Sequence, residues 1–126
     1  MTEHTSLIDR YIAAWNETDA KRRRELIADT YTEGASYVDP VAKSIGHGGI
    51  DAMIAGVQER FPGHAFRRTS DVEEHNNRVR FRWELAPADG PPIVAGTDFG
   101  VLAEKGERIE AITGFFDHVA VQAPTH

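Results

Sequence analysis

The feature that most constrains the fold is a stretch of strict alternation at residues 78–85, which read Arg-Val-Arg-Phe-Arg-Trp-Glu-Leu. Every second side chain is apolar and the residues between are charged. Successive side chains of a β-strand point to opposite faces, so this pattern predicts a strand with one buried and one exposed face. The buried face is expected to hold Val79, Phe81, Trp83 and Leu85. The chain must therefore build a sheet that covers a core.

Helical patterns precede this strand. An apolar stripe at helical spacing predicts a first helix, with Thr5 or Ser6 as its N-cap. The stripe consists of Leu7, Ile8, Tyr11, Ile12 and Trp15. Asp19 is expected to cap a second helix, which buries Leu26 and Ile27 and whose buried face can extend to Tyr31.

A third helix is predicted after a glycine-rich turn at residues 46–49, and Pro62 with Gly63 should end it. Its apolar face is expected to hold Ile50, Met53, Ile54, Val57 and Phe61. Between the second and third helices, residues 35–38 predict a short strand that ends at Asp39 and Pro40, because proline lacks the N–H that a strand needs.

Further strands are predicted at about residues 65–72, 93–103 and 108–121, with a turn at residues 75–77. Helices followed by an antiparallel meander indicate an α+β fold with a curved antiparallel or mixed sheet of about five to six strands. Three N-terminal helices and this sheet should form a cone around an apolar pocket. Gly96, Gly100 and Gly114 suggest the bulges that such curvature requires.

Composition limits the class of protein. The 126 residues are expected to form a single domain over residues 1–126, and a net charge of −6 disfavours nucleic acid and anionic membranes as partners. The basic run at residues 21–24 is interpreted as a solvated helix face. The chain has no cysteine, no signal-like start and no apolar run of membrane-spanning length, so cytoplasmic residence is expected.

Three polar residues interrupt these apolar patterns: Tyr11, Asp39 and Asp98. Asp98 shares its strand face with Val94 and Gly100, so its carboxyl group should be poorly solvated and readily neutral. Asp39, nearer the rim of the sheet, should remain ionised and act as a base. Such a pair suits proton transfer next to a carbonyl group, with Tyr11 as a further hydrogen-bond donor.

Structural roles remain open for each of the three. Tyr11 can be a core aromatic residue and Asp39 a turn residue, while Asp98 can pair with Arg82 or Arg108. The six histidines show no spacing typical of metal ligands, so no metal site is expected.

Three segments resemble the ketosteroid isomerase branch of the SnoaL-like, or nuclear transport factor 2-like, superfamily. They are Arg-Tyr-Ile-Ala-Ala-Trp-Asn from residue 10, Ala-Ser-Tyr-Val-Asp-Pro-Val from residue 35 and Gly-Thr-Asp-Phe from residue 96. The resemblance implies that Asp39 shuttles a proton while Tyr11 and Asp98 stabilise the oxyanion. It implies no cofactor and no metal. The expected ligand is a small apolar organic molecule.

The walls of the pocket are expected to include Trp15, Met53, Val57, Phe61, Trp83 and Phe116, which can equally fill it as core. The leading hypothesis is an isomerase of apolar ketones. The alternatives are a polyketide-cyclase-like aldol reaction and a non-catalytic ligand-binding or dimerisation domain. The outer face of the strand with Thr97, Phe99 and Val101 is predicted to form a homodimer.

Overall fold

The elements follow the predicted order, with helices before the long strands. The computed structural model describes residues 4–105 and 107–120. Its first half contains α1 (Thr5–Asn16), α2 (Ala20–Thr30), β1 (Tyr31–Val38), β2 (Lys43–Ile45) and α3 (Gly46–Arg60). Its second half contains β3 (His64–Arg68), β4 (Glu73–His75), β5 (Arg78–Pro87), β6 (Val94–Leu102) and β7 (Ile109–Val119).

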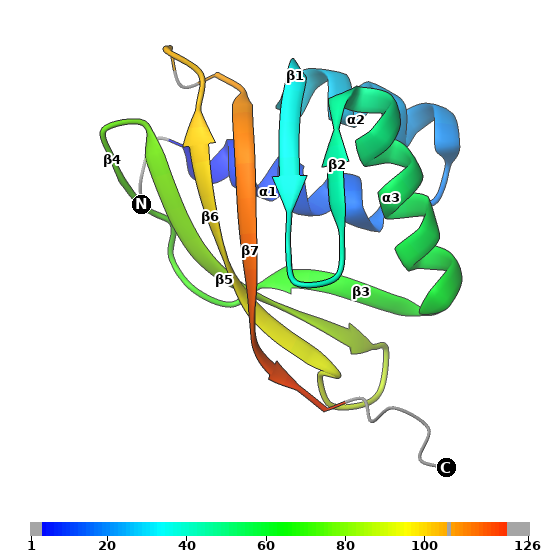
Figure 1. The fold of residues 1–126 in the computed structure, drawn as a ribbon. Helices are drawn as coiled ribbons and strands as arrows, with labels where there is room; N and C mark the ends of the chain where they lie inside the picture. Colours follow the sequence, from blue (N-terminus) through cyan, green and yellow to red (C-terminus); the bar gives the residue numbers. More distant parts are fainter. Residues whose placement is uncertain (1–3, 106, 121–126) are drawn as a thin grey trace.

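The strands form one mixed sheet of seven strands in the order β2-β1-β7-β6-β5-β3, with β4 also paired to β5 (Figure 1). All neighbours are antiparallel except β1 and β7, which run parallel. The predicted curved sheet and three helices are confirmed. The expected number of strands was too low, because β2 and β4 have three residues each, too few for a period-two pattern.

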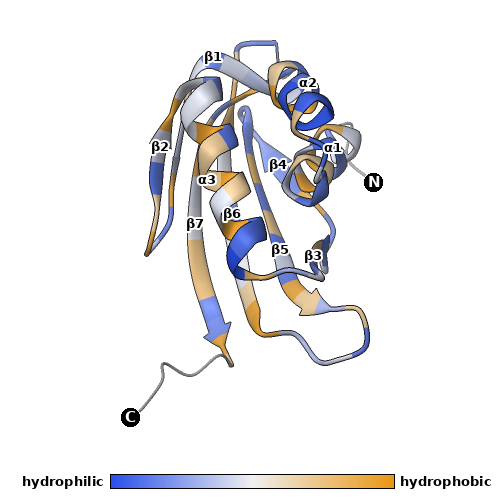
Figure 2. Cartoon of the chain, turned by 90° about the vertical axis from the view of Figure 1, so that its right-hand side faces the viewer, coloured by the Kyte–Doolittle hydropathy of each residue, from blue (hydrophilic) through white to orange (hydrophobic). Residues whose placement is uncertain are grey.

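The three helices lie on one side of the sheet, as the two perpendicular views show (Figures 1 and 2). β5 displays the predicted alternation, with Val79, Phe81, Trp83 and Leu85 buried towards the helices. These side chains meet Ile8, Ile27, Ile50 and Ile54 from the helices in one core cluster. No helix within residues 4–105 and 107–120 is long and apolar enough to cross a membrane.

The helix starts differ from one another. The cap predicted for the second helix is confirmed, since the Asp19 side chain accepts a 2.9 Å hydrogen bond from the backbone N–H of Arg22. The cap predicted for the first helix is wrong, because Thr5 and Ser6 lie inside α1 and no side chain caps it. The predicted glycine turn is also wrong: residues 46–49 form the first turn of α3 itself, directly after β2.

One residue of the basic run is buried, which corrects the interpretation of residues 21–24 as solvated. Arg23 is only 5% exposed, because it lies one helical turn from the buried Ile27. Its Nε donates to Asp51 Oδ1 at 2.7 Å, and its Nη1 donates to Gln58 Oε1 at 3.0 Å. Arg23 therefore joins α2 to α3, while its three neighbours in the run are exposed.

Glycine allows the close strand packing that bends the sheet. The pairing of β6 with β7 shifts register at Ala95 and Gly96, as the glycine pattern predicted. A Cβ atom at Gly96 would lie 2.4 Å from the Phe115 carbonyl oxygen and 2.5 Å from the Trp83 ring. No side chain fits there, so the strand can approach its neighbours only with glycine at this position.

Candidate functional site

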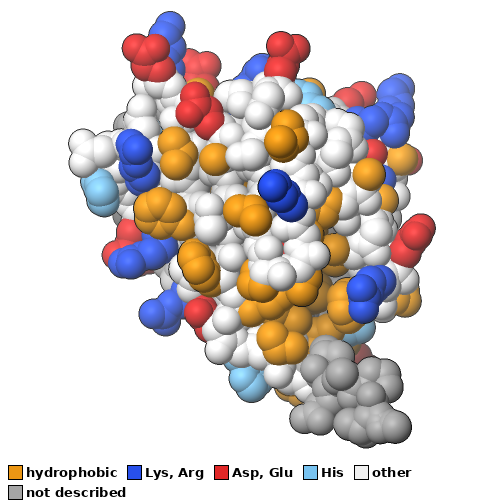
Figure 3. All heavy atoms as spheres, in the orientation of Figure 1, with side chains coloured by type: hydrophobic (Ala, Val, Ile, Leu, Met, Phe, Trp, Pro, Cys, Tyr) orange, Lys and Arg blue, Asp and Glu red, His pale blue; other side chains and the backbone are white. Residues whose placement is uncertain are grey.

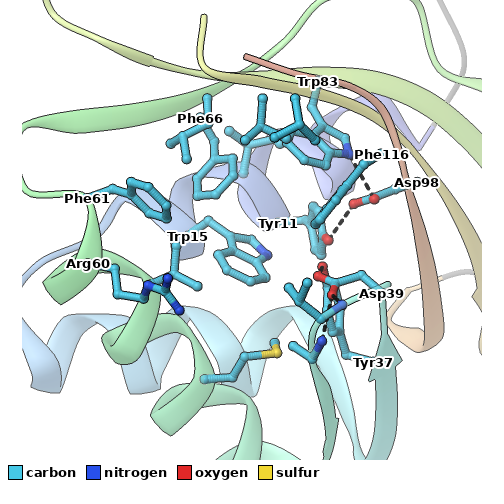
Figure 4. Close-up of a pocket in the computed structure, with 18 residues that line it drawn as sticks. Tyr11, Trp15, Tyr37, Asp39, Arg60, Phe61, Phe66, Trp83, Asp98 and Phe116 are labelled. Atoms are coloured by element: carbon cyan, nitrogen blue, oxygen red, sulfur yellow. Dashed lines mark hydrogen bonds between the residues drawn. The ribbon is translucent and has the colours of Figure 1, made fainter. Parts of the chain in front are cut away.

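A cavity of about 470 Å³ opens between the helices and the inner face of the sheet. Figure 4 shows its lining residues, which come from α1, α3 and from strands far apart in the sequence. All six residues predicted as walls line it, so their side chains surround a space and do not fill it. They are Trp15, Met53, Val57, Phe61, Trp83 and Phe116. The three predicted polar residues, Tyr11, Asp39 and Asp98, line the same cavity.

Asp98 is buried in the cavity wall and accepts two hydrogen bonds (Figure 4). The Tyr11 hydroxyl donates to its Oδ2 at 2.6 Å, and the Trp83 indole N–H donates to its Oδ1 at 2.9 Å. Asp98 is 3% exposed, whereas Arg82 and Arg108 are on the exposed surface. The alternative of an ion pair with either arginine is therefore wrong. Asp98 pairs with Phe81, the residue before Arg82, so the side chains of Asp98 and Arg82 point to opposite faces of the sheet.

Burial controls the protonation of these groups. Desolvation raises the pKa of Asp98 to about 6, although hydrogen bonds from Tyr11 and Trp83 lower it; the charge of Asp39 raises it further. Desolvation, followed by the charge of Asp98, raises the pKa of Tyr11 well above its usual value. Tyr11 therefore remains a donor, and the Asp98 carboxyl group is neutral at a higher pH than a surface aspartate.

Asp39 is a turn residue, and its side chain also lines the cavity. Its Oδ1 accepts hydrogen bonds from the backbone N–H groups of Val41 and Ala42, each at 2.8 Å, which holds the turn between β1 and β2. Its Oδ2 accepts a hydrogen bond from the Tyr37 hydroxyl at 2.7 Å. Burial raises the pKa of Tyr37 above its usual value, so that this phenol stays a donor. Three donors thus fix the Asp39 carboxylate at the cavity.

Asp98 and Asp39 both lie close to Gly114. Gly114 pairs with Asp98 across β6 and β7, and a Cβ atom on it would lie 2.9 Å from Asp98 Oδ1. The same Cβ would lie 3.3 Å from Asp39 Cβ and 3.5 Å from the Tyr37 Oη. Because Gly114 has no side chain, Asp98, Asp39 and Tyr37 can all approach its backbone closely.

The indole N–H of Trp15 is buried beside the cavity. Its Nε1 has no hydrogen-bond partner among the residues that the structure describes, and the Trp15 ring lines the cavity. The Tyr31 hydroxyl is likewise buried without a partner that meets hydrogen-bond geometry among these residues. Burial raises the pKa of Tyr31, and its interaction with Trp15 lowers it.

Sequence reasoning missed three lining residues that bear on chemistry or shape: Tyr37, Arg60 and Phe66. Two of them left a readable signal. Tyr37 of β1 lies two residues before Asp39, a spacing that directs both side chains to the same side of an extended chain. Arg60 follows Val57 by three residues on the same face of α3. In the described part of the chain, no three His, Cys, Asp or Glu side chains gather closely enough to hold a metal ion.

A curved mixed sheet that wraps three helices around an apolar cavity defines the nuclear transport factor 2-like α+β cone fold. The chain belongs to the SnoaL-like family, because the model of the SnoaL-like domain matches residues 8–115. No protein of curated function matches the sequence at a significant level.

Solved structures of similar fold extend this relationship. A SnoaL-like protein of Agrobacterium tumefaciens, provisionally assigned as an isomerase, is 40% identical, with a TM-score of 0.88 over 94% of this chain and 100% of that one. Two others are similar in fold at lower identity. A provisional ketosteroid isomerase of Kribbella flavida shows a TM-score of 0.66 at 16% identity, over 95% of this chain and 82% of that one. A provisional polyketide cyclase of Sinorhizobium meliloti shows a TM-score of 0.67 at 15% identity, over 86% of this chain and 93% of that one.

Proposed function

We propose that this protein is a ketosteroid-isomerase-like enzyme that moves a proton within a small apolar ketone. One observation carries the proposal: Tyr11, Asp39 and Asp98 lie together in the wall of an otherwise largely apolar cavity. Such a cavity binds an apolar body, and its few polar groups select the position of one oxygen atom.

The chemistry assigns a different role to each group. Asp39 takes a proton from the carbon next to the ketone and returns it farther along the same molecule, so that the double bond moves and no atom is gained or lost. Meanwhile the ketone oxygen gains negative charge. It replaces Asp98 as the acceptor of the Tyr11 hydroxyl, and the neutral Asp98 carboxyl group supplies a second hydrogen bond.

The different environments of the two acids support this division of roles. Asp98 is buried and its pKa is raised to about 6, which favours a neutral donor. Asp39 is partly exposed and accepts three hydrogen bonds, which hold its carboxyl group in place at the cavity wall. The similarity to a provisionally assigned isomerase at 40% identity agrees with the proposal.

The test is isomerisation of a steroid β,γ-unsaturated ketone, followed by the ultraviolet absorbance of the conjugated product. We expect Asp39→Asn to lower kcat by a factor of about 10² to 10⁴, since it removes the general base. Asp89→Asn, which alters an exposed carboxyl group, is the matched control and should leave kcat unchanged. Because Asp98 must carry a proton, kcat/KM should fall as the pH rises above about 6, and Asp98→Asn should remove this fall.

A polyketide ester methyl substrate assayed in parallel separates the proposal from a cyclase-like aldol reaction. Turnover of that ester without turnover of the steroid would favour the cyclase. Binding of both compounds with turnover of neither, in folded protein, would leave a ligand-binding domain and contradict the proposal.

A further inference from the structure

The cavity carries opposite charges on different parts of its wall. Arg60 is the one basic side chain among its described lining residues, and Asp39 and Asp98 are the acidic ones. Arg60 is an exposed residue at the rim of the cavity. In Figure 4 it lies across Trp15 from both acids, and its guanidinium group is turned towards the cavity. A long molecule in this cavity therefore meets acids at one end and a cation at the other.

Arg60 has no ion pair and no side-chain hydrogen bond to any residue that the structure describes. Five other arginines, at positions 22, 23, 67, 68 and 80, each pair with a carboxylate. Arg60 occupies the last turn of α3, where a cation is favourable because of the helix dipole. The dipole explains a basic residue at this point of the helix, but it does not require that the side chain form part of the cavity wall.

We propose that Arg60 binds a carboxylate at the far end of the substrate, so that the substrate class is an elongated apolar ketone with a terminal carboxylate. This inference rests on the proposed function in taking an apolar ketone as the ligand. A guanidinium group matches the planar carboxylate with two parallel hydrogen bonds. The reverse orientation would place the substrate carboxylate against Asp39, where like charges repel. Arg60 thus directs the ketone towards Tyr11 and Asp98.

Binding of rigid phenols tests this without turnover. One pair is 2-naphthol and 6-hydroxy-2-naphthoic acid, and a longer pair is 4-phenylphenol and 4′-hydroxybiphenyl-4-carboxylic acid. In each pair the hydroxyl group can occupy the oxygen position beside Tyr11, and only the second compound carries a carboxylate at the opposite end. Isothermal titration calorimetry then gives the ratio of Kd values within a pair.

We expect at least one acid to bind more tightly than its neutral partner. Arg60→Gln should weaken that acid roughly tenfold, as loss of a charged hydrogen bond predicts, and change the neutral compound less than twofold. Arg24→Gln is the matched control, because Arg24 is an exposed helical arginine outside the cavity, and should alter neither. Added salt should reduce the preference for the acid.

Equal or weaker binding of both acids by the native protein would overturn the assignment of Arg60. So would an unchanged ratio of Kd values in Arg60→Gln. Failure of the steroid assay with these ratios intact would contradict the proposed isomerisation alone, since no turnover enters the measurement. Failure of all four phenols to bind would contradict both proposals.

Discussion

Burial and hydrogen bonding oppose each other at Asp98. Desolvation of the carboxylate raises its pKa, while the hydrogen bonds from Tyr11 and Trp83 lower it. Burial dominates, because the resulting pKa is about 6 against an ordinary 3.8. The folded protein therefore binds this proton more tightly than the unfolded chain does, and the stability must depend on pH.

The pH dependence of unfolding tests this balance. Between pH of about 4 and 6 the folded state holds more protons at Asp98 than the unfolded state, so the free energy of unfolding falls as the pH rises. The contribution is complete below the unfolded pKa and is lost above the folded one. In urea titrations from pH 4 to 7, wild type should lose on the order of 2 kcal/mol relative to Asp98→Asn. Parallel curves for the two proteins would show that Asp98 is not desolvated.

Individual site residues could be predicted from the sequence, but their partners could not. Strand parity placed Asp98 on an apolar face, and helical spacing placed Tyr11 in a buried stripe. The hydrogen bond between them joins positions 87 residues apart. It depends on how α1 crosses the sheet, which no local pattern encodes. The space at Gly114 depends in the same way on the pairing of β6 with β7.

At the scale of elements, Arg23 fastens α2 to α3. Its side chain is 6% exposed and bridges Asp51, Gln58 and the Glu17 carbonyl oxygen. Arg23→Met leaves Asp51 without its cation, so we expect the free energy of unfolding to fall by about 2–4 kcal/mol. Urea denaturation measures this loss. Arg24→Met, at an exposed neighbour in the same helix, should change stability by less than about 0.5 kcal/mol. Equal effects of the two would refute the bridging role.

Gly96 holds β6 close to β7 and to Trp83. In Gly96→Ala the added methyl group would lie 2.4 Å from the Phe115 carbonyl oxygen, so backbone must move. We expect a loss of about 1–3 kcal/mol in stability and a changed near-ultraviolet circular dichroism signal from Trp83. Gly34→Ala in β1 is the control, because no atom lies within 4 Å of its added Cβ. A Gly96→Ala protein as stable as the control would contradict the close packing.

Element predictions succeeded where the pattern was long and local. The eight alternating residues of β5 predicted that strand and its buried face, which Figure 2 shows as alternating hydropathy. The parallel pairing of β1 with β7 was not predicted, because the two strands lie far apart in the sequence and no local pattern shows which strands become neighbours. The first turn of α3 was missed because three of its four residues are glycine, which is typical of a turn between elements. Of these glycines only Gly46, where the chain enters the helix, has a positive φ, of 78°.

At the scale of the whole molecule, the outer face of the sheet exposes large apolar side chains. Val38 of β1 and Phe99 of β6 both pair with Thr113 of β7, so the three form a row across neighbouring strands. Phe115 and Thr97 form the adjacent pair on the same face. Figure 3 shows hydrophobic side chains spread over this side of the molecule among charged ones. Phe99 is 43% and Phe115 57% exposed, a large apolar area for a surface in water.

We propose that two copies of the chain pair through this outer face, around a twofold axis that covers Phe99 and Phe115. Light scattering coupled to size exclusion should give the mass of a dimer. Phe115→Glu places two negative charges near each other at a twofold interface, so it should yield a monomer that keeps its fold. Ala52→Glu adds the same charge on the exposed side of α3 and should remain dimeric. A monomeric wild type at every concentration would disprove the pairing, and a dimer in Phe115→Glu would place the interface elsewhere.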